Sequence, residues 1–221
     1  TLIFGSGSND TAKTIEFSKK AQELGADALL LVVPYYNKPP QRGMVQHFQA
    51  IADAVSIPCF LYNVPGRTGI SLSVASVLEL STHPRIIGIK EASGDMKIIK
   101  ELKQKVPKDF VLLSGDDGTY VDFLIEGGHG VISVSSHIMP AQMIQWTEWC
   151  KQGKNELALK DIQKFKKSID LLFMEANPIP VKKCMALMGI IQSAELRLPL
   201  VELEKENTEL LKNEMKAQGL L

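Results

Sequence analysis

Lys90 follows Ile86–Ile89, a short apolar run rich in β-branched residues, where an ammonium group is costly to bury. The run is too short for a helix, so we predict a strand buried on both faces, with Gly94 and Asp95 opening the turn behind it. Desolvation lowers the pKa of a lysine toward the range in which its neutral amine attacks a carbonyl and forms a Schiff base. The alternative is a lysine whose stem packs on apolar neighbours while its head reaches water.

Other polar side chains gather where neighbouring strands are predicted to end. In a parallel β/α barrel these carboxyl ends carry the βα loops and the working residues. Sequential strands are neighbours in such a barrel, so we expect Tyr62 and Lys90 to lie side by side as a phenol–amine pair for proton transfer. The strand ends carry Tyr35 and Tyr36; Tyr62 and Asn63, with Arg67 just beyond; Lys90 and Glu91; Gly115, Asp116 and Asp117; and Ser133 and Ser135.

Each of these residues also has a plainer interpretation. Tyr62 could be a buried aromatic with a satisfied hydroxyl, and Arg67 a solvated loop arginine. Asp116 and Asp117 fit a turn and a helix N-cap better than an acid pair. The histidines at 47, 83 and 129 have no serine or cysteine partner in a recognisable order, so the sequence does not support a hydrolase triad.

The elements that must position these residues alternate between strands and helices. Near-continuous apolar runs separated by amphipathic segments predict a parallel sheet covered by helices. No G-x-G-x-x-G follows any run, which favours a barrel over a doubly wound dinucleotide-binding sheet. The predicted strands are Leu2–Gly5, Ala28–Val33, Pro58–Tyr62, Ile86–Lys90, Phe110–Ser114 and Gly130–Ser133.

The alternation stops after Gly153, and the remaining chain is predicted to be helical. The expected helices are Asn155–Phe173, one beginning at Pro180, and Val201–Gln218. We therefore predict a partial (β/α) barrel over residues 1–153 and a C-terminal helical region over 154–221. A closed (β/α)8 barrel has eight strands and six are found, so two units are absent from this sequence or the sheet is open.

Composition excludes several classes of protein. The 221 residues are 45% hydrophobic, enough for one barrel core, and 25 basic residues balance 25 acidic ones, which argues against nucleic-acid binding and for a small neutral or anionic ligand. Three dispersed cysteines without metal-ligand spacing favour a reduced cytoplasmic setting and no metal site. No run is long enough to span a membrane, and no basic-then-apolar leader precedes the first strand.

Six motifs, in this order and at these spacings, resemble the dihydrodipicolinate synthase family of pyruvate-dependent class I aldolases, to which N-acetylneuraminate lyase also belongs. They are "PYYNKP", "YNVPGRTG", "IGIKEASGD", "LLSGDD", "GGHGVISV" and "NPIPVK", and the resemblance extends over the whole sequence. It implies a TIM (β/α)8 barrel with a C-terminal helical extension. The implied activity is condensation of pyruvate with L-aspartate 4-semialdehyde in lysine and diaminopimelate biosynthesis, by a homodimer or homotetramer without a cofactor.

The resemblance also implies roles for individual residues. Lys90 matches the Schiff-base lysine, and Tyr62 the tyrosine that moves protons during imine formation and cyclisation. Arg67 matches the arginine that binds the aldehyde's carboxylate, and Tyr36 the tyrosine that completes a neighbouring subunit's proton relay. Residues that line the family's pyruvate pocket are matched by Gly115 and Ile132.

The sequence departs from the family in two places. The two strand–helix units that precede the third strand in the family, and their "GTTGE"-like loop for the pyruvate carboxylate, have no counterpart here. Gly7 and Asn9 match the family's allosteric lysine site, but Lys13 stands where lysine-inhibited members have an acidic residue.

These departures leave two other hypotheses open: an aldolase of the same family for another aldehyde, and a non-catalytic chain or fragment. We also expect the first and last of six strands to present unpaired edges that another segment or subunit must cover.

Overall fold

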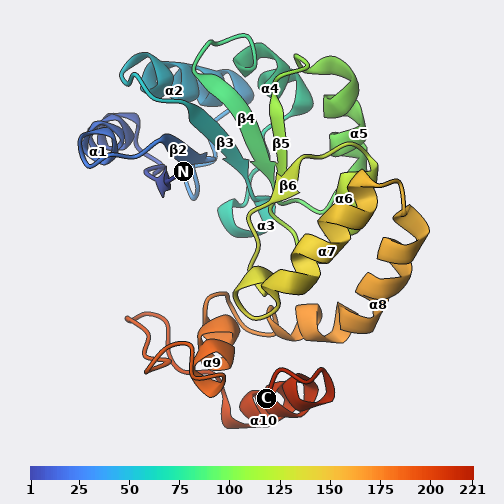
Figure 1. The fold of residues 1–221 in the computed structure, drawn as a ribbon. Helices are drawn as coiled ribbons and strands as arrows, with labels where there is room; N and C mark the ends of the chain where they lie inside the picture. Colours follow the sequence, from blue (N-terminus) through green and yellow to red (C-terminus); the bar gives the residue numbers. More distant parts are fainter. The chain divides into compact units, whose positions relative to one another are not determined.

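Six short parallel strands form one sheet, and their spatial order is the order of the chain. The computed structural model describes residues 1–221. The strands are β1 (Ile3–Gly5), β2 (Ala28–Val32), β3 (Cys59–Asn63), β4 (Ile86–Glu91), β5 (Val111–Ser114) and β6 (Gly130–Val131). The prediction of six parallel strands is confirmed, with β1 and β6 at the two edges of the sheet (Figure 1).

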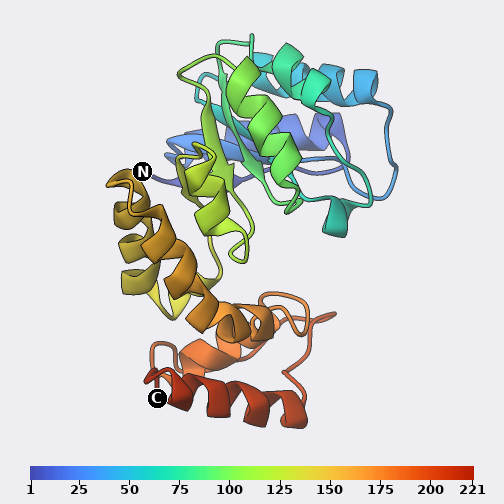
Figure 2. The same cartoon turned by 90° about the vertical axis from the view of Figure 1, so that its right-hand side faces the viewer.

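Apolar side chains on one face of the central strands are fully buried. Leu29 and Leu31 in β2, Leu61 in β3, Ile89 in β4 and Leu112 in β5 are fully buried. Covering one face, helices α1 (Thr11–Glu23), α2 (Gln41–Asp53), α4 (Val74–Leu80) and α5 (Met96–Lys105) follow one another along the sheet (Figures 1 and 2). This covering explains the apolar side chains on that face, whereas side chains on the other face, such as Leu30 in β2 and Leu113 in β5, are only partly buried.

Side-chain caps start three of these helices where the strands' connecting loops end. Asp10 accepts a hydrogen bond from the Lys13 amide at α1, and Asp95 accepts one from the Lys97 amide at α5. Ser73 caps α4 in the same way. Because each cap satisfies an amide that has no partner within its helix, it fixes where the βα loop stops.

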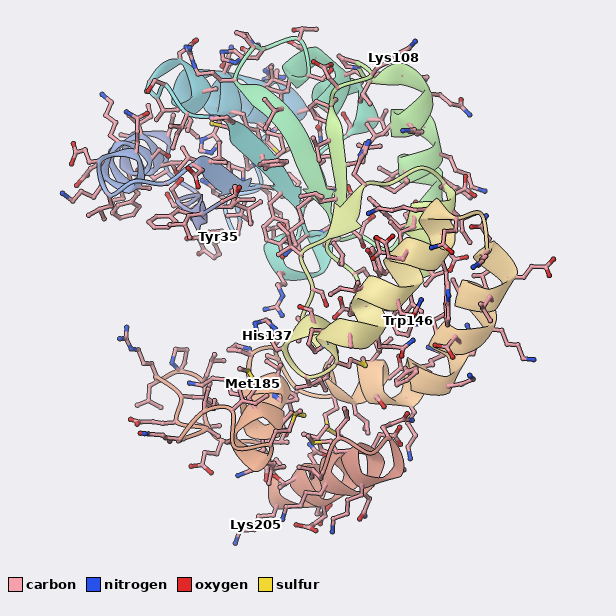
Figure 3. All side chains as sticks on the ribbon, viewed as in Figure 1. Tyr35, Lys108, His137, Trp146, Met185 and Lys205 are labelled. Carbon is pink, nitrogen blue, oxygen red and sulfur yellow. The ribbon has the colours of Figure 1, made fainter.

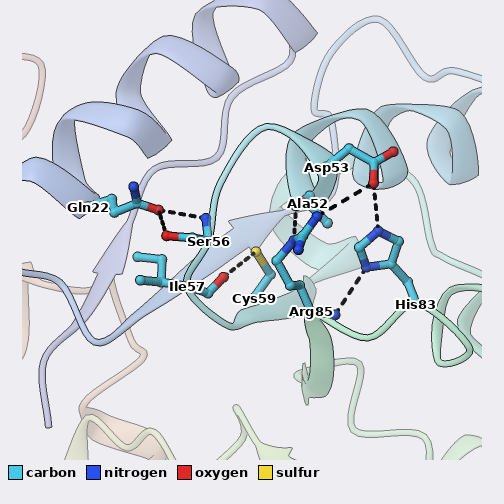
Figure 4. A network of polar contacts seen from close by, with 8 residues as sticks. All are labelled: Gln22, Ala52, Asp53, Ser56, Ile57, Cys59, His83 and Arg85. Carbon is cyan, nitrogen blue, oxygen red and sulfur yellow. Dashed lines mark hydrogen bonds and ion pairs between the residues drawn. The ribbon is translucent and has the colours of Figure 1, made fainter.

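The amino-terminal end of the sheet is held by a polar network that Figure 4 shows. Gln22 Oε1 accepts hydrogen bonds from both the backbone amide and the hydroxyl of Ser56, ahead of β3. Ahead of β4, Arg85 Nε donates to the Ala52 carbonyl oxygen at 2.6 Å, and His83 Nε2 lies 3.1 Å from Asp53 Oδ1. These contacts join helices to strands at the end of β3 opposite to Tyr62.

The chain packs as two units. One consists of Thr1–Asp116 and Glu126–Ile132 and contains the whole sheet; the other consists of Asp117–Ile125 and Ser133–Leu221 and is helical. The helical unit contains α6 (Tyr120–Ile125), the 3₁₀ turn η1 (Ser135–His137), α7 (Pro140–Lys151), α8 (Asn155–Leu171), α9 (Ile179–Leu187) and α10 (Lys205–Ala217). The division into domains after residue 153 stays a prediction.

The prediction that the last helix begins at Val201 is wrong. Residues 201–204 are not helical, and α10 begins at Lys205. Glu204 has an extended backbone, and its amide donates to Glu175 Oε1. Because this partner lies outside the helix, it replaces the helical turn that the apolar spacing suggested.

A buried tryptophan centres the helical unit. Trp146 is fully buried between α7 and α8, its ring meets Phe165 edge-to-face at 5.6 Å, and its Nε1 donates to Asp161 Oδ2 at 3.0 Å (Figure 3). Ser168 in α8 donates to Glu214 Oε1 in α10 at 2.8 Å, which ties the last helix to the unit. Both of these buried donors therefore have the partner that their burial requires.

Candidate active site

Strand register brings Tyr62 and Lys90 together. The two residues are directly paired between β3 and β4, and Lys90 Nζ lies 4.3 Å from the centre of the Tyr62 ring. The prediction that they are neighbours is confirmed, although β4 ends one residue later, at Glu91. A cation over a ring face is attracted by the ring's quadrupole, so this face favours a positive charge on Nζ.

The surroundings of the Tyr62 phenol favour its protonated form. Burial raises its pKa, and the positive charge of Arg67 acts in the opposite direction without cancelling the effect. The hydroxyl is therefore protonated at neutral pH and can donate a proton to an atom placed beside Lys90.

Gly115 leaves room for the lysine side chain. A Cβ at this position would lie 2.7 Å from Lys90 Cε and 2.6 Å from Ala92 Cβ, both shorter than real Cβ contacts. The Gly115 amide also donates to the Glu91 carbonyl oxygen at 2.7 Å, so its backbone cannot move aside without losing that bond. Any larger residue here would displace Lys90.

Arg67 is carried by the loop that follows β3. The loop contains the short helix α3 (Pro65–Thr68), which begins with proline and ends at Gly69 in the left-handed region, φ 74°. Thr68 Oγ1 donates to the Ile70 carbonyl oxygen at 2.8 Å and stabilises the turn. Arg67 itself is exposed, as a group that must meet an entering carboxylate would be.

Tyr36 lies in the loop after β2 and has a strained backbone. Its φ is 70°, in the left-handed region, where a bulky residue costs about 1–3 kcal/mol. Its side chain is 87% exposed. Its role in a neighbouring subunit's proton relay stays a prediction. Tyr35, in the same loop, is labelled in Figure 3.

The predicted allosteric residues lie in the loop after β1, which is bonded to the tyrosine loop. Asn9 Nδ2 donates to the Tyr35 carbonyl oxygen at 3.2 Å, and Asn37 Nδ2 donates to the Asn9 carbonyl oxygen at 2.9 Å. Gly7 passes so close to β2 that a Cβ would lie 2.5 Å from the Val32 nitrogen. Lys13, exposed in the first turn of α1, follows directly. Their regulatory role stays a prediction.

Two further predicted positions differ in what they contact. Ile132 donates its amide to the Ser114 carbonyl oxygen at 3.0 Å, so it continues the β5–β6 pairing at the carboxyl edge. Asp117 is a capping residue, but not of the helix that follows it: its Oδ2 accepts from the Val134 and Ser135 amides at 3.0 and 2.7 Å. It therefore caps η1, because the segment after β6 brings those amides to it.

Sequence reasoning placed Asn63 and Glu91 at strand ends without giving them a role. They form the next directly paired position after Tyr62 and Lys90, and Asn63 Nδ2 donates to Glu91 Oε2 at 2.8 Å. Burial raises the pKa of Glu91, while hydrogen bonds from Asn63 and Ser93 act to lower it. An acidic residue at the end of an otherwise apolar strand is the signal that identifies the pair.

Neither a metal centre nor a membrane span is seen. No group of three or more His, Cys, Asp or Glu side chains is arranged to hold a metal ion, and all three cysteines are free. None of the helices is long and apolar enough to cross a bilayer.

At the carboxyl edge of this parallel β/α sheet, Lys90 Nζ lies over the face of the Tyr62 ring. This arrangement is that of a class I aldolase-type lyase. The chain belongs to the dihydrodipicolinate synthetase family, whose model matches residues 1–218.

The most informative relatives are all synthases of this kind. A curated 4-hydroxy-tetrahydrodipicolinate synthase of Bdellovibrio bacteriovorus is 59% identical over 220 residues, which are 100% of this chain and 75% of the relative. The dihydrodipicolinate synthase of Thermotoga maritima has a TM-score of 0.96 at 39% identity, covering 99% of this chain and 75% of that one. The chloride-inhibited enzyme of Acinetobacter baumannii, complexed with pyruvate, has a TM-score of 0.95 at 42% identity, with the same coverage.

These likenesses fix the architecture. The six strands and their helices are part of a TIM barrel, as predicted, and the chain spans about three quarters of the relatives' length. The catalytic and binding roles of the individual site residues remain predictions. These residues are Lys90, Tyr62, Tyr36, Arg67, Gly115 and Ile132.

Proposed function

We propose that this protein condenses pyruvate with L-aspartate 4-semialdehyde, a step of lysine and diaminopimelate biosynthesis, through a Schiff base on Lys90. The observation that carries the proposal is the position of Lys90 Nζ, 4.3 Å from the centre of the Tyr62 ring at the carboxyl edge of the sheet. The names of the relatives, and the pyruvate in one of their structures, support this choice of substrates.

The first half of the reaction uses Lys90 and Tyr62. The neutral amine adds to the keto carbon of pyruvate, and the carbinolamine loses its oxygen as water to leave an iminium ion. Tyr62 supplies the proton that this leaving oxygen needs, since its raised pKa keeps the phenol protonated. The iminium carries a positive charge at the same nitrogen, so the ring face stabilises it.

The second half forms the new carbon–carbon bond. Tyr62, left as a phenolate, takes a methyl proton and so converts the iminium to an enamine. The enamine carbon attacks the aldehyde carbon, and the phenol returns the proton to the aldehyde oxygen. The substrate's amino group then adds to the iminium carbon and displaces the Lys90 amine, which closes the ring. Arg67 would hold the carboxylate of the semialdehyde in its guanidinium fork, because a fork bonds both carboxylate oxygens.

The working form would be a homodimer or homotetramer. Tyr36 is strained and 87% exposed, which fits a side chain that completes the proton relay of a second copy. The free cysteines fit the cytoplasmic setting that such a biosynthetic step implies.

Trapping the imine tests the proposal directly. The enzyme is treated with pyruvate and borohydride, and the reduced adduct is mapped by mass spectrometry; condensation with L-aspartate 4-semialdehyde and with a panel of other aldehydes is assayed in parallel. We expect one adduct, on Lys90, and fastest turnover with the semialdehyde. An adduct on Lys97 or Lys100 with Lys90 unmodified would overturn the mechanism, and faster turnover of another aldehyde would overturn the substrate.

A further inference from the structure

A second pair of residues lies one position beyond Tyr62 and Lys90. Asn63 and Glu91 are directly paired between β3 and β4, and they are 0% and 4% exposed. Since successive side chains of a strand point to opposite faces, this pair lies behind the sheet from the reacting residues. It cannot contact the substrate, so any effect on the reaction must be transmitted through what it holds.

Asn63 closes the loop that carries Arg67. Its Oδ1 accepts from the Leu72 amide at 3.0 Å, and its Nδ2 lies 3.1 Å from Ser71 Oγ. Residues 64–71 therefore leave the strand at Asn63 and return to the same side chain. One amide group fixes the distance between the two ends of the Arg67 loop.

Glu91 determines which way that amide faces. Glu91 Oε2 accepts from Asn63 Nδ2 at 2.8 Å, which leaves Asn63 Oδ1 to receive the Leu72 amide. Glu91 Oε1 accepts from the Ser93 amide at 2.7 Å, in the loop that follows the Schiff-base lysine. Both carboxyl oxygens thus have donors, one from the last residue of β3 and one from the loop after β4, as a buried carboxyl requires.

A third side chain restrains the far end of the same loop. Gln41 Nε2 donates to the Ser71 carbonyl oxygen at 2.8 Å, and Gln41 Oε1 accepts from the Ser73 amide at 2.9 Å. Gln41 begins α2, directly after the loop of Tyr36. The Arg67 loop is therefore held from β3, β4 and α2, while Arg67 itself stays exposed.

We propose that Asn63 and Glu91 are positioning residues that fix the Arg67 loop and thereby set the enzyme's preference for aldehydes that carry a carboxylate. The inference rests on the proposed function, because it assigns Arg67 to the second substrate. The pair acts on the aldehyde step and leaves imine formation at Lys90 intact. The guanidinium fork meets a carboxylate only in a narrow range of geometries, so a small shift of the loop is enough.

Exchanging the donor and the acceptor of the pair tests the proposal. Asn63→Asp places two acceptors face to face, and Glu91→Gln leaves one acceptor oxygen for two donors, so either Asn63 Nδ2 or the Ser93 amide must face an amide NH2 group. The double variant restores the contact: the amide introduced at position 91 can donate to the carboxylate introduced at position 63, which still accepts from the Leu72 amide. We expect each single variant to raise KM for the semialdehyde about tenfold, and the double variant to return it to within about threefold of the parent.

Two readouts separate positioning from a general loss of structure. Borohydride trapping of pyruvate on Lys90 should stay within about twofold in all three variants, and the ratio of kcat/KM for the semialdehyde to that for propanal should fall in the single variants alone. In an Arg67→Ala background, Glu91→Gln should add little, because the group it positions is gone. Gln22→Ala removes a comparable side-chain clamp at the opposite end of β3 and is the matched control, with KM unchanged.

Several outcomes would overturn the inference. KM unchanged in both single variants, imine trapping reduced as much as condensation, or no recovery in the double variant each contradicts it. If the single variants do not fold, Ser71→Ala weakens the same loop more mildly, and an unchanged aldehyde preference there contradicts it equally. A parent enzyme that forms no pyruvate imine refutes the proposed function instead, so the two failures are distinct.

Discussion

Lys90 Nζ lies 4.3 Å from the centre of the Tyr62 ring, because β3 and β4 pair these two residues directly. The tyrosine therefore makes two separate contributions to the site. In the proposed mechanism, the ring face would favour a positive charge at Nζ, including that of the iminium, while the hydroxyl, whose pKa is raised by burial, would give the proton.

Tyr62→Phe and Tyr62→Leu should separate those contributions. Phenylalanine keeps the ring and loses the hydroxyl, so we expect kcat to fall about 100- to 10,000-fold while a slow pyruvate imine still forms. Leucine loses both, and the yield of reducible imine should fall further, since about 1 kcal/mol of cation–ring attraction is lost. Steady-state kinetics and borohydride trapping measure the two effects. Equal trapping in both variants would show that the ring face contributes nothing.

Gly115→Ala should impair Lys90 without touching its chemistry. The added Cβ would lie 2.7 Å from Lys90 Cε, so the lysine must shift, and a shift of this size can cost about 100-fold in rate. Overpacking should also destabilise the protein by about 1–3 kcal/mol. Gly5→Ala is the control, because a Cβ there meets nothing within 4 Å. Full activity of the Gly115 variant, measured as kcat and as the trapping rate, would contradict the steric argument.

The sequence predicted the strands and the pairing of Tyr62 with Lys90 because both depend on local pattern and chain order. Near-continuous apolar runs predicted six parallel strands, and sequential order predicted that Tyr62 and Lys90 are adjacent. Contacts between distant segments could not be read in this way. Asp117 looked like a cap for the next helix, yet it caps η1, since only the fold brings the Val134 and Ser135 amides to it. The Asn63–Glu91 bond and the room left by Gly115 depend on pairing across strands in the same manner.

Inhibition by L-lysine should be weak or absent. Lys13 is exposed in the first turn of α1, beside the Asn9 loop that is bonded to the tyrosine loop. A cation there repels the ammonium groups of an incoming lysine and offers it no ion-pair partner. Titration of the synthase activity with L-lysine measures this, and Lys13→Glu should increase the sensitivity. Strong inhibition of the parent enzyme that is abolished by mutation of Asn9 would show that the site works despite Lys13.

His47 should make the protein less stable in mildly acidic solution. Its ring is 7% exposed, Nδ1 lies 2.9 Å from Thr11 Oγ1, and Nε2 is buried without a hydrogen-bond partner. Burial lowers the pKa of His47 from 6.5 to about 4, against a weaker opposing effect from the charge of Asp10. Protonation would place an unpaired N–H and a positive charge in the gap between α1 and α2, where neither is solvated.

The direction of this pH effect on stability follows from which state, folded or unfolded, binds the proton at the higher pH. Between pH 6.5 and 4 the unfolded chain is protonated at this residue and the folded chain is not, so the free energy of unfolding falls as the pH falls through that window. The contribution is fully present above pH 6.5 and amounts to about 3 kcal/mol. Urea unfolding of the parent and of His47→Asn at pH 7 and pH 4 measures it: the variant, less stable at pH 7 through lost packing, should lose about 3 kcal/mol less on acidification. Equal acid losses in the parent and in His47→Asn would show that His47 takes up its proton without cost in the folded protein.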